Sequence, residues 1–155
     1  MYTFYKPSNN PAGLSGSVGG SISSTQLNGQ LGELFAHVEG PPEGVSGVYQ
    51  YRKVFVKNEY ASISTYTKAW FDQADHIDQI SMALELSGSE TVSSPLVSPT
   101  GIGVWSTPTN YVDGLSLDTL SISQSTGLWI RQYLTGISEE DPFATCRLYV
   151  GGIIG

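Results

Sequence analysis

Two groups of acidic residues are the first candidates for chemistry in this 155-residue chain. Asp72, Asp75 and Asp78 recur at every third position around His76, and the acids of 139–141 are consecutive. Calcium binds several oxygen ligands on a flexible loop, so either group could hold it. Neither group has the loop glycine and final bidentate glutamate of an EF-hand. We therefore predict no metal site and no cofactor, and calcium remains the alternative.

Residue types for zinc binding or covalent catalysis are scarce. Zinc sites use paired His and Cys ligands, whereas His37, His76 and Cys146 are far apart in the sequence. There is no Gly-x-Ser-x-Gly elbow, no phosphate-binding glycine loop and no carboxylate pair on a strand, since Glu85 and the other strand glutamates are isolated. We predict no catalytic residue and no enzymatic activity. Cys146, in an apolar run, is expected to be a small buried side chain.

Trp70 is the aromatic residue with the clearest alternative uses. It ends the strand-like run "ASISTYTKAWF" beside the acidic segment 72–78. An aromatic ring next to acids could form a contact platform for a sugar, although packing at the end of a strand is the commoner role. Trp105 and Trp129 lie within strand-like runs, and we expect both in the core.

The segment "VYQYRKVFVKN", residues 48–58, concentrates cations in a chain that is otherwise acidic. Strand alternation places Arg52 and Lys53 on opposite faces, followed by three apolar residues that would be buried on both faces. We predict that Arg52, Lys53 and Arg131 are structural or interface cations. Arg52 could pair with an acid of either acidic group.

The bulk charge limits the partners. Seven Lys and Arg residues and a formal net charge of −7 argue against nucleic acid and against an anionic membrane surface. No apolar stretch approaches the ~18–20 residues of a membrane-spanning helix, and no secretory leader is visible. We expect no membrane partner and synthesis in a reducing cytoplasm.

Short strand-like runs separated by turns predict an all-β fold. No helical pattern of 3.6-residue period continues for more than two turns. The composition agrees, because 18 Gly and 8 Pro with only 14% charged residues suit turn-rich sheets. The expected strands are 33–39, 48–58, 61–71, 80–86, 100–107, 115–123, 127–134 and 143–152. In 80–86, alternation predicts that Ile80, Met82, Leu84 and Leu86 point inward. We predict an antiparallel β-sandwich, Ig-like or jelly-roll-like, of seven to eight strands over residues 31–155.

Residues 1–30 are expected to form a flexible N-terminal arm. Gly, Ser, Asn and Pro dominate this segment, and its apolar residues are too sparse for a core face. Tyr2, Phe4 and Tyr5 cluster at its tip. We predict that these three aromatic residues anchor the arm on a neighbouring subunit, with a disordered tail as the alternative.

Two segments together resemble virion structural proteins of tailed bacteriophages. One is "VYQYRKVFVKN", which is similar to a recurrent segment that follows a glycine-containing turn. The other is "GLWIRQYLTGISEEDPFATCRLYVGG", which resembles the closing strand, acidic loop and final strand of the same proteins. The likeness covers roughly residues 31–152 and departs from the pattern at Gln132. The matching residues are Tyr51, Arg52, Lys53, Val56, Lys57, Asn58, Trp129 and Arg131.

The resemblance implies a non-enzymatic virion component, assembled in the host cytoplasm, that binds other virion proteins. A capsid cement or decoration protein that stabilises neighbouring capsid subunits as a homo-oligomer is the expected role. The alternatives are a neck, collar, baseplate or tail-fibre component, and a carbohydrate-binding β-sandwich that uses Trp70 and the acidic loop with calcium.

Overall fold

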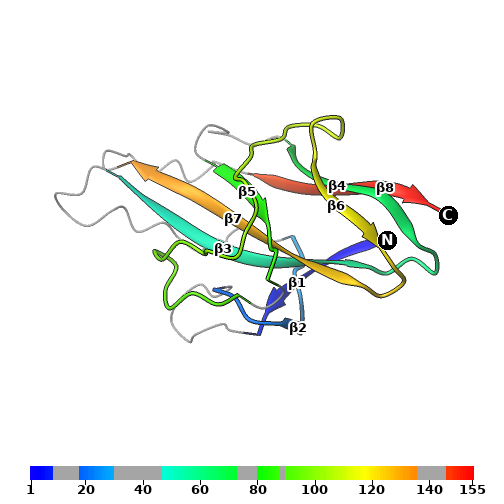
Figure 1. Cartoon of the computed structure of the whole chain (residues 1–155), viewed down its shortest axis with the longest axis horizontal. Coiled ribbons are helices and arrows are strands. Elements are labelled where there is room, and N and C mark those ends of the chain that lie inside the picture. Colours follow the sequence, from blue (N-terminus) through cyan, green and yellow to red (C-terminus); the bar gives the residue numbers. More distant parts are fainter. Residues whose placement is uncertain (9–17, 30–46, 73–79, 88–89, 136–145) are drawn as a thin grey trace.

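The computed structural model describes residues 1–8, 18–29, 47–72, 80–87, 90–135 and 146–155 (Figure 1). In these ranges the backbone forms eight strands and no helix, which confirms the predicted all-β class. The strands are β1 (Tyr2–Pro7), β2 (Ile22–Gln26), β3 (Gly47–Asn58), β4 (Ser64–Asp72), β5 (Ile80–Leu84), β6 (Leu115–Leu120), β7 (Ser125–Thr135) and β8 (Arg147–Ile154).

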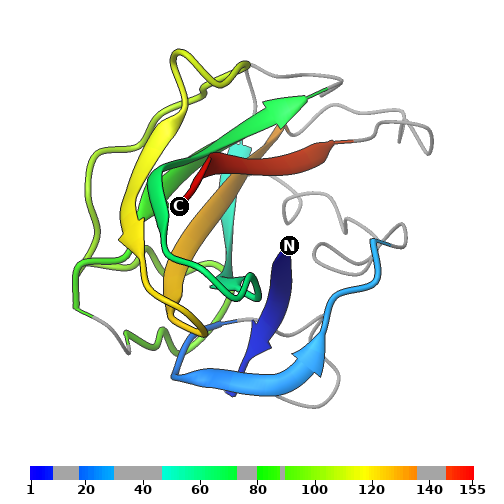
Figure 2. The same cartoon turned by 90° about the vertical axis from the view of Figure 1, so that its right-hand side faces the viewer.

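The strands form two antiparallel sheets that pack as a sandwich. The larger sheet has the order β2-β1-β3-β7-β5, and the smaller has the order β6-β4-β8. The two sheets are the two layers of the molecule (Figure 2). Their facing sides form one apolar core, in which Val54 and Leu128 of the larger sheet meet Phe71 and Leu117 of the smaller. This arrangement confirms the predicted sandwich.

Strand β3 is buried on both faces, which explains its mixed composition. Val54 and Val56 belong to the core between the sheets. The opposite face of β3 contributes Tyr51 to a second apolar cluster, which also contains Trp129 of β7. This cluster lies on the outer side of the larger sheet. Segments around Val18 and Val92, together with half-buried Trp105, cover that cluster. Trp129 is thus core as predicted, and Trp105 is at the margin.

The first residues of the chain are part of the larger sheet, not a separate arm. Strand β1 pairs with β3 from Tyr2 opposite Asn58 to Tyr5 opposite Phe55, and β2 pairs with the other edge of β1. The prediction of a flexible arm is therefore wrong for residues 1–8 and 18–26. Because β1 brings only two large apolar residues to the core, its stability depends on pairing with a distant strand. Residues 9–17 and the predicted boundary at 30–31 lie outside the described residues.

Other local predictions have mixed outcomes. Segment 100–107 makes only isolated bridges, of Ile102 with Glu85 and of Ser106 with Met82, and is not a strand. Leu86 is 67% exposed, because β5 ends at Leu84 and the chain turns away. Cys146 is exposed, because it precedes the first residue of β8. The predicted strand 33–39 lies outside the described residues.

Candidate binding surface

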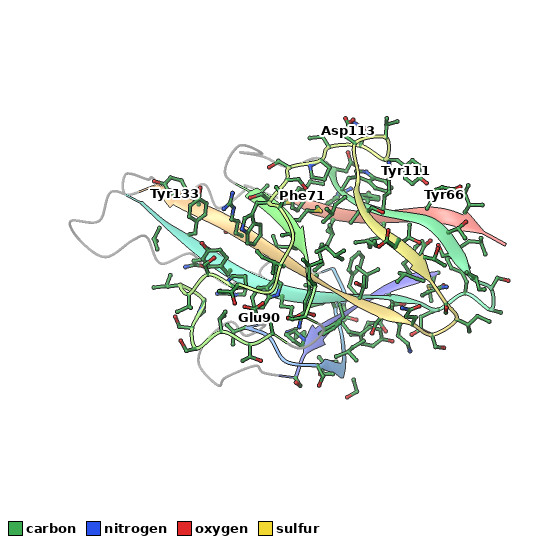
Figure 3. The ribbon with its side chains drawn as sticks, viewed as in Figure 1. Tyr66, Phe71, Glu90, Tyr111, Asp113 and Tyr133 are labelled. Atoms are coloured by element: carbon green, nitrogen blue, oxygen red, sulfur yellow. The ribbon has the colours of Figure 1, made fainter. Side chains whose placement is uncertain are left out.

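The outer face of the smaller sheet carries a group of aromatic residues. Strand β4 buries Thr67, Ala69 and Phe71 against the core, so the intervening positions point away from it. Phe71 lies between the sheets, whereas Tyr66 lies near the surface with Tyr111 (Figure 3). We call Tyr66, Trp70, Tyr111 and Tyr149 the aromatic face.

Trp70 and Tyr149 form the centre of the aromatic face. They are register partners on β4 and β8, so their side chains emerge side by side. Their ring centroids are 5.9 Å apart with an interplanar angle of 22°. Glycine at position 151 makes room for the indole, since a Cβ there would lie 3.1 Å from Trp70 Cη2. Trp70 is half-buried, and Tyr149 is 39% exposed.

Tyr111 reaches the same face from the loop before β6. Its ring meets Trp70 edge-on, with centroids 5.8 Å apart and an interplanar angle of 85°. The Tyr111 hydroxyl donates a hydrogen bond to the Tyr66 carbonyl oxygen (2.9 Å). Lys68 Nζ donates to the Val112 carbonyl oxygen (2.7 Å) and lies 5.4 Å from the Tyr111 ring centroid. The ring of Tyr111 is therefore held in place by contacts within the domain itself.

A β-bulge displays Tyr66. The pairing of β4 with both neighbours shifts register between Ser64 and Lys68. Tyr66 has a φ of 51°, in the left-handed region that side chains with a Cβ adopt at a cost. Bulges redirect side chains, and Tyr66 is 70% exposed. Ile153, on β8, extends the exposed apolar surface.

The three predicted cations occupy three different environments, and Lys53 is wholly inside the protein. Its ammonium lies 2.5 Å from Glu85 Oε1 and donates to the Gly20 carbonyl oxygen at 2.8 Å. Burial lowers the pKa of Lys53, and the hydrogen bond to Glu85 partly offsets that effect. This places Lys53 in a structural role rather than at an interface.

Arg52 and Arg131 lie on opposite faces of the larger sheet. Arg52 is buried toward the core side, where Nη1 donates to the Tyr51 carbonyl oxygen (2.9 Å), and desolvation lowers its pKa. The acids predicted to pair with Arg52 lie, except for Asp72, outside the described residues. The Arg131 guanidinium lies 4.6 Å from the ring centroids of both Tyr49 and Trp105. Its Nε donates to Ser81 Oγ at 2.7 Å, so Arg131 is held within its own sheet.

The predicted anchors Tyr2, Phe4 and Tyr5 contact their own domain. The Tyr2 hydroxyl bonds with Ser64 Oγ, and both Tyr2 and Phe4 pack against the core between the sheets. Tyr5 points to the other side of β1 and donates to Glu59 Oε1 at 2.9 Å. Tyr2 and Phe4 thus hold β1 within the sandwich, and docking of the three residues on a neighbouring subunit stays a prediction.

Metal ligands do not converge in the described ranges, where no three His, Cys, Asp or Glu side chains form a group. Asp72 ends β4, while Asp75, His76, Asp78 and the acids of 139–141 lie outside the described residues. None of the described segments forms a helix that could cross a lipid bilayer.

Comparisons of the chain with protein-family models, curated proteins and solved structures give no match. The geometry of the described surfaces is therefore the basis for assigning function. Sequence reasoning singled out Trp70 but missed the other members of the aromatic face. Alternation in "STYTKAW" and "RLYVGG" puts Trp70 and Tyr149 on outward positions of their strands, and this was the available signal.

Proposed function

We propose that this protein is a non-enzymatic structural component of a tailed-phage virion that binds and stabilises neighbouring capsid subunits. The observation that carries the proposal is the aromatic face, in which three exposed tyrosines surround the half-buried Trp70 on the outer side of the smaller sheet. The resemblance of β3 and β7 to virion proteins supplies the setting. A neck, collar, baseplate or tail-fibre position in the virion is the alternative.

The aromatic face has the properties of a protein-docking surface. Tyrosine and tryptophan bring a large contact area with few rotatable bonds, and they are enriched among the residues that dominate binding energy. The contacts of Tyr111 with Tyr66 and of Lys68 with Val112 order this surface in the free protein, which reduces the entropy lost on binding. Trp70 and Tyr149 would form the anchor, and exposed polar residues such as Ser116 would surround it.

Copy number would strengthen such a contact. Weak contacts repeated around a symmetric particle give high avidity without a large interface in each copy. In this proposal the protein acts in the assembled virion, its partner is the major capsid protein, and it associates as a homo-oligomer on the particle.

Localisation in intact particles tests the proposal. Cryo-electron microscopy of purified virions should show this chain beside every capsid subunit or capsomer, with the aromatic face turned toward the shell. A single ring at the portal or tail would support the neck or tail alternative. Absence from the particles would overturn the virion proposal.

Binding of the purified protein to particles that lack it tests the surface itself. Trp70→Ser with Tyr149→Ser should reduce binding at least tenfold, because both central rings are lost. Tyr49→Ser is the matched control, since Tyr49 is a similarly exposed tyrosine on the opposite sheet. Unchanged binding by the double variant would contradict the assignment of this face. Binding of the same face to an arrayed glycan in place of capsid protein would replace the proposal with the carbohydrate-binding alternative.

A further inference from the structure

A second, separate site lies at the other side of the molecule, where β1, β2, β3 and the turn before β7 meet. It is a shallow pocket of about 370 Å³, within the usual range for small-ligand sites. It is lined by Tyr5, Ile22, Ser23, Ser24, Lys57, Ser123 and Ser125. Four of these seven residues are serines that come from two distant parts of the chain.

The serine hydroxyls are available to a ligand. Ser23 Oγ accepts a hydrogen bond from the Thr25 backbone amide (3.1 Å) and keeps its own proton to donate. The hydroxyls of Ser24, Ser123 and Ser125 have no partner among the described residues. A hydroxyl both donates and accepts, so a cluster of them is complementary to another group of hydroxyls.

Lys57, the one cation among the described residues that line the pocket, is already paired with a carboxylate. Lys57 Nζ lies 2.8 Å from Glu59 Oε1, the same atom that accepts the Tyr5 hydroxyl. The hydrogen bond between them raises the pKa of Lys57 and lowers that of Glu59, so both stay charged at neutral pH. A pocket whose cation is paired in this way favours an uncharged ligand over a phosphate or sulfate.

From this combination we propose that the pocket binds a neutral saccharide unit. Its hydroxyls would exchange hydrogen bonds with Ser24, Ser123 and Ser125, and its apolar C–H groups would lie against the Tyr5 ring and Ile22. The proposal is independent of the virion role, because the pocket shares no residue with the aromatic face.

NMR titration of the ¹⁵N-labelled full chain tests this site. The sugars are glucose, galactose, mannose, fucose and N-acetylglucosamine, and inorganic sulfate is titrated separately for comparison. At least one sugar should bind with a Kd in the millimolar range and shift the amide signals of Ser24, Ser123 and Ser125. Tyr5→Ser should weaken that binding about tenfold, and Ser125→Ala several-fold. Ser93→Ala, an exposed serine outside the pocket, is the control and should leave the Kd unchanged.

Three results would overturn the proposal: no sugar shifts the pocket signals, sulfate alone shifts them, or the Ser24→Ala and Ser125→Ala variants bind as the unmodified chain does. If Tyr5→Ser unfolds, the two serine variants still test the site, because Ser24 and Ser125 lie at the surface and their loss should not disturb the core. The Trp70→Ser, Tyr149→Ser variant separates the two proposals, because it should lose particle binding and retain sugar binding.

Discussion

Lys53 Nζ and Glu85 Oε1 lie 2.5 Å apart, with 0% and 1% of their side chains exposed. The same carboxylate oxygen accepts the backbone amide of Glu90 at 2.8 Å, and the ammonium lies 4.6 Å from the Phe55 ring centroid. This buried ion pair joins β3 and the end of β5 to the segments that cover the outer side of the larger sheet.

Removing one member of this pair should leave the other as an uncompensated buried charge. We expect Lys53→Met or Glu85→Gln alone to lower the free energy of unfolding by about 3–5 kcal/mol. The double variant should lose much less than the sum of the two single losses. Urea unfolding of the four proteins in a double-mutant cycle measures the coupling. Additive losses would mean that the two charges do not depend on each other.

Glu59 should make the packing of β1 sensitive to acid. Hydrogen bonds from Lys57 and Tyr5 lower the pKa of Glu59, so the folded state binds its proton less readily than the unfolded chain. This stabilisation is present above the unfolded value of about 4.3 and is lost as the pH falls through the lower folded pKa. Amide exchange of β1, corrected for its intrinsic pH dependence, should show less protection below about pH 4. In Glu59→Gln this step should be absent; an identical pH profile would contradict the role of Glu59.

Substitution of Asn58 should destabilise the fold more than substitution of any other polar residue at the end of β3. Its side chain is fully buried, and Nδ2 donates to the carbonyl oxygens of Ser62 (3.0 Å) and Leu120 (2.9 Å). Its Oδ1 accepts the Tyr60 amide at 2.9 Å. Asn58→Ala leaves these groups without partners and should cost about 2–4 kcal/mol in thermal or chemical unfolding. Asn58→Asp keeps the acceptor but turns a carboxylate oxygen toward the Ser62 and Leu120 carbonyl oxygens, so it should cost at least as much as Asn58→Ala. A loss below 1 kcal/mol for both variants would show that water replaces the side chain.

Deletion of residues 1–8 should destabilise the domain, in contrast to the behaviour of a detachable arm. The truncated chain loses the core contacts of Tyr2 and Phe4 and exposes the edge of β3. We expect a loss of about 3 kcal/mol or more. Calorimetry of the full and truncated chains measures the difference. Equal melting temperatures would restore the arm interpretation.

Gly151→Val should disturb the aromatic face without removing any ring. The added side chain would meet the Trp70 indole, whose Cη2 and Cζ3 lie 3.1 and 3.3 Å from the position of a Cβ. The indole must then leave its present position, which should alter its stacking on Tyr149, shift tryptophan fluorescence and weaken binding to particles. Gly155→Val, where a Cβ meets nothing within 4 Å, is the matched control. Unaltered fluorescence and binding would show that the position of the indole is unimportant.

Strands are predictable from the sequence where their own residues have a strong preference for extended backbone. Strands β3 and β7 are long and rich in β-branched and aromatic residues, so local patterns were sufficient. Strand β1 was missed because its stability comes from pairing with β3, about fifty positions away, as in Tyr5 opposite Phe55. The segment around Ile102 alternates like a strand, but its backbone makes only isolated bridges.

The functional surfaces were less predictable for the same reason. Trp70 was recognised as a strand-end ring, yet only the pairing of β4 with β8 brings Tyr149 beside it. Glu85 looked isolated in the sequence, because its partner Lys53 belongs to another strand of the sheet. Residue type indicates what a side chain can do, whereas the register between distant strands determines which side chains meet.

The burial of β3 on both faces also disfavours pairing of β3 with β1 and β7 in a shifted register. Arg52 and Lys53 are neighbours that occupy opposite faces, so a slip of one residue would exchange their environments. Lys53 would then enter the apolar interior without Glu85, and Val54 would face the carboxylate. Alternative alignments of this strand during folding are thereby made unfavourable, and single-residue insertions within it should be tolerated far less than insertions in the exposed loop at Leu96 and Val97.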